Sequence, residues 1–238
     1  QVFLDFESYI DQIEVNKISQ NIPESLADSR TVQWIETVLT EGSLTDIMLT
    51  TRFNMSGEIE SPNTKFSANL NGATISADPK WPSIENINAK VNFSNDYLKI
   101  VGNQASVEDI DLSYLSITTR DFSQPDSTLS LNARFNSESL IIEDFIKKSS
   151  VSEKIKAYLE EFELKGKLWG NVNMVVPTQR GNDQKLKLSF DMFASDNTLS
   201  VLDGKLKIDD FNSQISYSDG LIRTKGKGLI GQELLQIS

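Results

Sequence analysis

The chain has 238 residues, of which 38% are hydrophobic, and its formal net charge is −11 at pH 7. This length permits one large β domain or two smaller ones, and the negative charge argues against binding to nucleic acid or an anionic bilayer surface, which both favour basic faces. The sequence contains no cysteine and no histidine, which excludes disulfides, thiolate metal sites and imidazole acid–base catalysis.

The N-terminal part of the chain predicts short strands separated by one helix. Asp28 or Ser29 can cap a helix over about 30–40, and Gly42 is a natural stop for it. No apolar run approaches the roughly 20 residues that span a bilayer. The chain begins without Met in the middle of a strand pattern, so we expect any membrane anchor to lie outside this segment. Alternating apolar residues predict strands at 2–6, 10–15 and 45–53.

The stretch from Thr64 to Val101 alternates apolar and polar residues most clearly. The Asn71-Gly72 pair accepts positive φ angles, so residues 64–77 are predicted to form a β-hairpin, and the alternation resumes at 87–93. A period of two places the apolar residues on one face of a strand and the polar ones on the other. This part is therefore expected to be antiparallel sheet with one apolar face.

The middle of the chain changes from strands to helices. Two helices are predicted at 137–148 and 152–161, where the apolar residues take helical spacing. A domain boundary is one explanation, but we adopt the other, a helical insertion at about 137–161 within a single segment that covers 1–238. The strands predicted before the insertion are 97–101, 105–112, 115–119 and 129–135.

The C-terminal part predicts strands again. One unusually long strand is predicted from Phe162 to Val176, with Gly166 and Gly170 as bulges or bends, and another at 186–194. Trp169 falls on the polar side of the long strand. Asp203-Gly204 and Asp219-Gly220 are further hairpin signals.

The predicted strands carry more apolar surface on one face than three short helices can cover. A second sheet, curling of the sheet on itself, or a ligand that is not protein must bury the remainder. We favour a mainly β fold, a long curled antiparallel sheet that forms an open groove, with about three short helices; a β-sandwich is the alternative. The residues expected to line the groove and bind lipid are Phe66, Ala68, Leu70, Ile75, Ile87, Ala89, Val91, Phe93, Leu129, Leu131, Phe135, Leu168, Val172, Met174, Val176, Leu186, Leu188, Phe190 and Met192.

Two stretches of the sequence resemble YhdP-like proteins of the AsmA-like superfamily. The first runs from Asn21-Ile22-Pro23-Glu24-Ser25-Leu26 through Trp34-Ile35 to Leu39-Thr40-Glu41-Gly42-Ser43-Leu44-Thr45-Asp46, with Ile22 where the family pattern has Leu. The second contains Phe66-x-Ala68, Gly72-Ala73-x-Ile75, Trp81-Pro82-x-Ile84 and Ala89-x-Val91-x-Phe93. The resemblance is specific over about 20–140 and rests on the β pattern alone beyond that.

This resemblance implies a role in lipid transfer. It implies a very long periplasmic protein of Gram-negative bacteria, anchored in the inner membrane by one N-terminal helix. A twisted β-groove would carry phospholipid toward the outer membrane and support its permeability barrier. The chain would then be an internal segment of that groove. Its partners would be phospholipid acyl chains, the flanking segments of the same long chain and, through an anchor absent from this fragment, the inner membrane, with no nucleic acid.

Signals for catalysis or cofactor binding are weak. The run Lys225-Gly226-Lys227-Gly228 lacks the spacing of a phosphate-binding loop, and the segment from Glu108 to Asp111 lacks the Gly and the final Glu of a calcium loop. We therefore expect no enzyme, no metal and no cofactor. Two other functions stay open: a structural or adhesin-like β-sandwich module, and an AsmA-like factor that assists outer-membrane protein assembly by binding nascent strands at its sheet edges.

Overall fold

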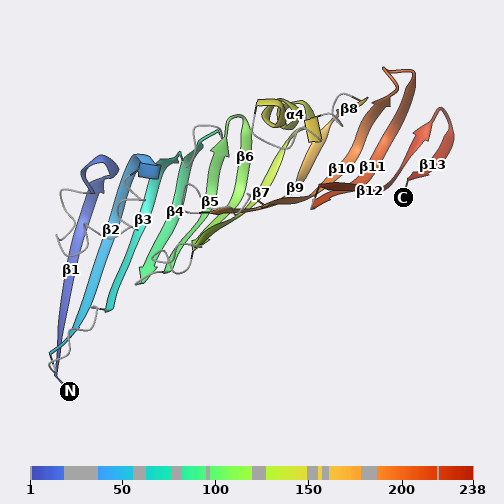
Figure 1. Cartoon of the computed structure of the whole chain (residues 1–238). Helices are drawn as coiled ribbons and strands as arrows, with labels where there is room; N and C mark the ends of the chain where they lie inside the picture. Colours follow the sequence, from blue (N-terminus) through green and yellow to red (C-terminus); the bar gives the residue numbers. More distant parts are fainter. Residues whose placement is uncertain are drawn as a thin grey trace.

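The computed structural model describes residues 2–18, 37–55, 63–76, 82–94, 97–119, 127–148, 155–156, 161–177, 187–218 and 220–237. These residues form one antiparallel sheet of 13 strands, drawn in Figure 1 as a long twisted band with the first and last strands at opposite ends. The elements are β1 (Phe3–Glu14), η1 (Val15–Lys17), β2 (Leu39–Asn54), β3 (Asn63–Ile75), β4 (Ile84–Ser94), β5 (Tyr97–Val107), β6 (Ile110–Thr119), β7 (Thr128–Glu138), α4 (Ser139–Lys148), β8 (Phe162–Lys165), β9 (Lys167–Pro177), β10 (Lys187–Val201), β11 (Leu206–Ser218), β12 (Leu221–Ile230) and β13 (Glu233–Ile237).

The strands follow one another across the sheet in sequence order, except that β8 pairs with β10 beside the main path. Within the described part of the chain, each strand makes broad contact only with the strands to which it is hydrogen-bonded, and no second sheet packs against this one. The expectation of a mainly β protein with one open antiparallel sheet is confirmed. The β-sandwich alternative is wrong.

The register of the sheet places apolar residues directly opposite one another in long rows. Paired residues share one face, with their Cβ atoms about 5 Å apart. The longest row takes one residue from each of eleven strands and contains no charged side chain: Ile13, Leu44, Leu70, Ala89, Gly102, Leu115, Ala133, Val172, Phe190, Tyr217 and Ile222. We call the side of the sheet that carries this row the apolar face.

The expected set of about three helices is wrong for the described residues, which contain one α-helix, α4, and the short 3-10 helix η1. Helix α4 confirms the prediction at 137–148. The helix predicted at 30–40 lies mostly outside the described residues. Its predicted end is already strand, because Leu39 begins β2 and pairs with Ile75. The helix predicted at 152–161 also lies outside them, apart from residues 155–156 and 161.

The hairpin predicted at 64–77 is wrong, because β3 runs without a turn through the Asn71-Gly72 pair. Gly72 does have a positive φ of 57°, and the register between β3 and β4 shifts between Leu70 and Ala73. The backbone N–H of Gly72 donates a hydrogen bond to the side-chain oxygen of Asn88, 3.1 Å away on β4. A β-bulge and a tight turn can both require a residue with positive φ. The Asn-Gly pair therefore predicts the backbone angle correctly, but the angle belongs to a bulge and not to a hairpin turn.

Gly42 lies inside β2, so the prediction that it ends a helix is also wrong. Its φ is +103°, and a Cβ atom there would lie 2.7 Å from the Cα of Ala73, at the bulge of β3. Gly72 also has a positive φ, but a Cβ atom there would meet nothing within 4 Å. The two glycines thus share a backbone requirement and differ in the space around them.

We expect Gly42→Ala to lower the free energy of unfolding by about 3 kcal/mol, since it adds overpacking to backbone strain. The matched variant Gly72→Ala carries the strain alone and should lose about 1 kcal/mol. Urea denaturation followed by circular dichroism measures both. Equal losses in the two variants would contradict the close approach of β2 to β3 at Gly42.

The long strand predicted at 162–176 is divided in two by Gly166, which confirms the expected bend there. Gly166 has a φ of +131°, and a Cβ atom at this position would overlap the side chain of Asn197. Both pieces, β8 and β9, lie along the same side of β10. Gly170 is different: it allows β9 to approach the backbone of Asp191 closely, without a bend.

The tight turns were predicted with mixed success. Asp203 and Gly204 form the turn between β10 and β11, as expected. A turn also joins β11 to β12, where Ser218 pairs with Leu221, although Asp219 itself lies outside the described residues. The strand predicted at 105–112 is wrong, because residues 108–109 form the turn between β5 and β6.

Candidate functional site

The predicted groove-lining residues all lie on the apolar face, apart from Leu186, which falls outside the described residues. The longest row contains some of these predicted residues, and two rows parallel to it contain most of the others. One row is Ala68, Val91, Ile100, Ile117, Leu131, Met174 and Leu188. The other is Leu49, Phe66, Phe93, Leu98, Thr119, Leu129 and Val176.

Several residues of this face were missed by sequence reasoning. They are Leu98, Ile100, Leu115, Ile117, Phe211, Ile215 and Tyr217, and most are buried. The period-two signal was present at Ile215 and Tyr217, which alternate with polar neighbours. On β5 and β6 the missed residues Leu98, Ile100, Leu115 and Ile117 lie inside the strands predicted at 97–101 and 115–119, so the alternation that could have assigned them to the face was present there too.

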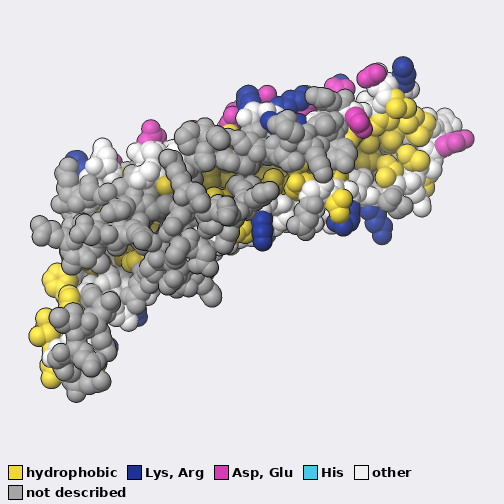
Figure 2. Space-filling view, in the orientation of Figure 1, with side chains coloured by type: hydrophobic (Ala, Val, Ile, Leu, Met, Phe, Trp, Pro, Cys, Tyr) yellow, Lys and Arg dark blue, Asp and Glu magenta, His cyan; other side chains and the backbone are white. Residues whose placement is uncertain are grey.

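The middle of the apolar face is closely packed. Leu70, Ile87, Leu98, Leu115 and Ile117 belong to one continuous hydrophobic cluster and are almost fully buried. Side chains from neighbouring strands of a twisted sheet lie within van der Waals reach of one another, which removes part of their apolar surface from water. Ile141, Ile142 and Phe145 of α4 also pack in this cluster. In Figure 2 hydrophobic side chains are visible at several places along the length of the molecule.

The N-terminal end of the apolar face is exposed. Leu4 and Phe6 of β1 are 55% and 52% exposed, and Phe53 of β2, the partner of Leu4, is 37% exposed. Phe6 pairs with Thr51, which is buried. Large apolar side chains at this end therefore lie in contact with water, in contrast to the packed middle.

Near the C-terminal end of the face, two aliphatic side chains from outside the sheet pack on aromatic residues. Ile155 is only 3% exposed and packs with Tyr217 of β11. Phe190 stacks on Tyr217, with the ring centroids 5.2 Å apart. Ile146 of α4 and Ile222 of β12 pack against the same cluster. At this end of the face, aliphatic side chains therefore pack on the stacked aromatic rings of Phe190 and Tyr217.

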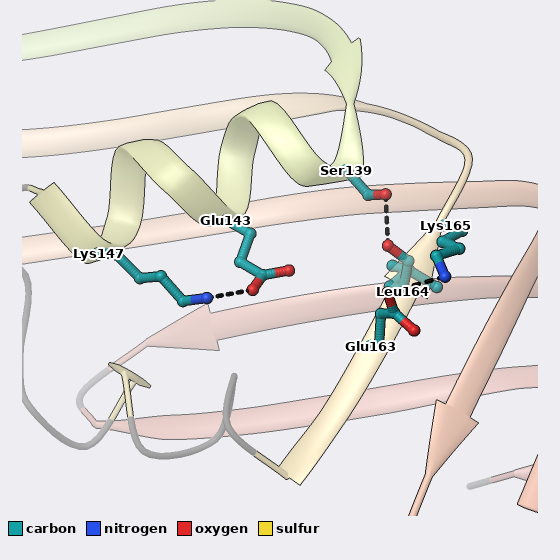
Figure 3. A network of polar contacts seen from close by, with 6 residues as sticks. All are labelled: Ser139, Glu143, Lys147, Glu163, Leu164 and Lys165. Atoms are coloured by element: carbon teal, nitrogen blue, oxygen red, sulfur yellow. Dashed lines mark hydrogen bonds and ion pairs between the residues drawn. The ribbon is translucent and has the colours of Figure 1, made fainter. Parts of the chain in front are cut away.

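Helix α4 is attached to the sheet at its first residue. The hydroxyl of Ser139 donates to the carbonyl oxygen of Leu164 on β8, as Figure 3 shows, and its backbone N–H donates to the carbonyl oxygen of Gly166, 2.8 Å away. Lys147 and Glu143 form an ion pair one turn apart on the helix. The start of α4 is thereby tied to the break between β8 and β9.

The other end of α4 meets the turn between β5 and β6. The ammonium of Lys148 lies 4.0 Å from a carboxylate oxygen of Glu108 in that turn and also forms an ion pair with Asp144. The hydrogen bond with Asp144, and then the charges of Asp144 and Glu108, raise the pKa of Lys148. All three side chains are partly exposed, so this second attachment is weak.

The opposite face of the sheet is mostly polar. Asn69 donates to Asp46, 2.7 Å away, and Asn88 donates to Gln104, 3.1 Å away, so that amide side chains link neighbouring strands. Trp169 was predicted on this side, and it is exposed there, stacked on Phe193 of β10 at 6.0 Å between ring centroids. The two faces thus differ sharply in chemistry.

The described residues contain no group of His, Cys, Asp and Glu side chains arranged to hold a metal ion. No helix in the described ranges is both long enough and apolar enough to cross a membrane. A family model described as "YhdP protein" matches residues 1–231. No curated protein and no solved structure matched the chain.

Proposed function

The chain belongs to the YhdP protein family, and from this premise we propose that it is a non-enzymatic segment of a lipid-transfer path. Its apolar face would hold the acyl chains of phospholipids. The observation that supports this most directly is the uncharged row that crosses eleven strands without interruption.

The length of the row matches such a role. Ten intervals between neighbouring strands span on the order of 50 Å, whereas one leaflet of a bilayer has a hydrocarbon thickness of about 15 Å. An acyl chain aligned with the row would therefore occupy only part of it. Each methylene removed from water contributes about 0.8 kcal/mol.

Movement along such a row follows from its repetition. Each step of about 5 Å brings an acyl chain from one strand to the next, where another apolar side chain replaces the contact just lost. The free energy of the bound chain then changes little from step to step, and no charge has to be crossed. The polar headgroup would stay in water, on the side of the acyl chain that points away from the sheet.

The cargo and its route come from the family resemblance. We propose that the segment lies in the periplasm of a Gram-negative bacterium and carries phospholipid between the inner and outer membranes, in support of the outer-membrane permeability barrier. Flanking segments of the same long chain would continue the sheet beyond β1 and β13. An anchor outside this fragment would join it to the inner membrane.

The two ends of the sheet favour a second candidate function. Among the described residues, β1 and β13 each pair with one neighbour only, so each leaves one edge open. An open edge can accept another strand through backbone hydrogen bonds. The second candidate is an AsmA-like factor that binds nascent strands during outer-membrane protein assembly.

A photoreactive residue in place of Phe93 separates the two candidates. Phe93 is half-buried on the apolar face, and Asn92 beside it is exposed on the polar face. For protein purified without detergent, we expect a phospholipid adduct at position 93 and none at the matched position 92, measured by intact-protein mass spectrometry. A polypeptide adduct would favour the second candidate. Lipid-free protein by native mass spectrometry, with no adduct at either position, would contradict lipid transfer.

A further inference from the structure

We propose that the apolar face carries the same acyl-chain subsite twice, once on β3 and β4 and once on β10 and β11. Each subsite consists of an aromatic pair and the apolar pair beside it. The first is formed by Phe66, Phe93, Ala68 and Val91, and the second by Phe190, Tyr217, Met192 and Ile215. This inference rests on the proposed function, because it concerns the same face and the same class of ligand. It adds where on that face the acyl chains are held.

The two strand pairs have the same register. The pairs of β3 and β4 that begin with Phe66 and Phe93 recur 124 positions later as the pairs of β10 and β11 that begin with Phe190 and Tyr217. In both cases the register shifts after the fifth of these pairs and again after the sixth. A β-bulge changes which residue faces which side of the sheet, so equal bulges keep equivalent residues on the same face.

The bulges are also fixed by equivalent contacts. Gly72 of β3 and Asp196 of β10 have positive φ angles of 57° and 54°. The backbone N–H of Gly72 donates to the side-chain oxygen of Asn88, 3.1 Å away, and that of Asp196 donates to the side-chain oxygen of Asn212, 3.2 Å away. Each acceptor lies 16 residues beyond its donor. The same amide contact therefore holds the same bulge in both strand pairs.

The strand that follows each pair approaches it in the same way. A Cβ atom at Gly102 of β5 would overlap the carbonyl oxygen of Asn88, and one at Gly226 of β12 would overlap the carbonyl oxygen of Asn212. A residue without a side chain permits both close approaches. The equivalence thus extends to a third strand, which supports two copies of one structural unit rather than a chance likeness of two strand pairs.

The equivalent positions on the apolar face have the same chemistry. Among the described residues of the three apolar rows, the aromatic side chains are the two of the first subsite and the two of the second. An aromatic ring offers a large apolar surface on which methylene groups can pack. Phe66 and Phe190 are both half-buried, although Ile146 and Ile155 also pack near Phe190. Each ring therefore keeps part of its surface accessible.

The distance between the subsites allows both to be filled at once. Six intervals between neighbouring strands separate β3 from β10, which corresponds to about 29 Å (Figure 1). Phe66 and Phe190 also belong to different rows, so the subsites are offset along the strands as well. An acyl chain that spans about 15 Å, the hydrocarbon depth of one leaflet, can occupy one subsite without reaching the other.

Photoreactive residues at single positions test the proposal. Two variants carry the probe in place of Phe66 or Phe190. Two matched controls carry it at Lys65 or Ser189, the preceding residues of the same strands, which point to the polar face. A fifth variant carries it at Leu131, which is half-buried on the apolar face of β7, between the subsites. Each protein is purified without detergent, incubated with vesicles of phosphatidylethanolamine and phosphatidylglycerol, illuminated, and measured by intact-protein mass spectrometry.

We expect phospholipid adducts of similar yield at positions 66 and 190, about threefold more than at 131, and almost none at 65 and 189. A threefold preference corresponds to about 0.7 kcal/mol, which is small enough for an acyl chain to leave a subsite. Native mass spectrometry of the unaltered chain should show up to two bound phospholipids.

An adduct at only one of positions 66 and 190 would overturn the repeated subsite and leave lipid transfer standing. An equal yield at 131 would do the same, since the face would then bind lipid uniformly. Absence of adduct at 66, 190 and 131 together would instead overturn the proposed function, and the repeated subsite with it.

Discussion

Replacing Phe6 with aspartate is expected to lower the amount of phospholipid bound at the N-terminal end of the apolar face at least about tenfold, while the free energy of unfolding stays nearly unchanged. Phe6 is 52% exposed and lies on the apolar face opposite Thr51. A carboxylate there cannot be paired with an acyl chain, and bringing the two together would dehydrate the charge at a cost of several kcal/mol. A loss of 1.4 kcal/mol in binding already corresponds to a tenfold change.

Phe3→Asp is the matched control for this variant. Phe3 is the same residue type on the same strand, is 48% exposed, and pairs with Asn54 on the opposite face. Its ring lies 5.6 Å from the guanidinium of Arg52, which an aspartate can still approach. Phospholipid adducts at a photoreactive residue in place of Leu4 report binding in both variants, and urea denaturation reports stability. Equal lipid binding by the two variants would contradict an acyl-chain path on this face.

A second large effect is expected in the middle of the sheet, on stability. Leu115 is fully buried at 0% exposure, between Gly102 of β5 and Ala133 of β7. Leu115→Asp removes the packing of a buried side chain and places an unpaired carboxylate there. Together, the lost packing and the buried charge should lower the free energy of unfolding by about 5 kcal/mol or more, which approaches the total stability of many proteins. We expect this variant to be largely unfolded by circular dichroism.

The neighbouring substitution Tyr114→Asp controls for position in the strand. Tyr114 is 39% exposed on the polar face and pairs with Arg134 of β7, so a carboxylate there gains a nearby positive charge. Its stability should stay within about 0.5 kcal/mol of the unaltered chain. A Leu115→Asp protein as stable as Tyr114→Asp would show that the middle of the apolar face is hydrated rather than packed.

These two predictions differ because the same face is exposed at one end and packed in the middle. Phe6 and Leu115 both point to the apolar side of the sheet, yet only at Phe6 do we expect a charge to be accepted without loss of folding. The earlier expectation of an open groove along the whole chain treated all alternating residues alike. Their burial now divides the face into an exposed end, a packed middle and an end where aliphatic side chains pack on aromatic rings.

At two glycines the local sequence was not sufficient to predict the structure. Asn71-Gly72 signals positive φ, but whether that angle makes a turn or a bulge depends on β2 and β4, since Gly42 packs against the bulge and Asn88 bonds to it. The local sequence around Gly42 predicts the end of a helix, and only its contact with Ala73 shows that it lies in a strand beside the bulge. In both places the deciding residue lies about 16 to 31 positions away in the sequence.

The sequence by itself determined the strand content and the division of the sheet into an apolar and a polar face, because the alternation of side chains along a strand follows from the geometry of neighbouring peptide units. It also determined the family, through short motifs that can be compared directly. Only the tertiary structure decided that the strands form one open sheet, that the apolar rows line up from β1 to β12, and that Ile155 lies on Tyr217. Those features depend on which strands pair and in which register, and pairing is set by contacts between residues far apart in the chain.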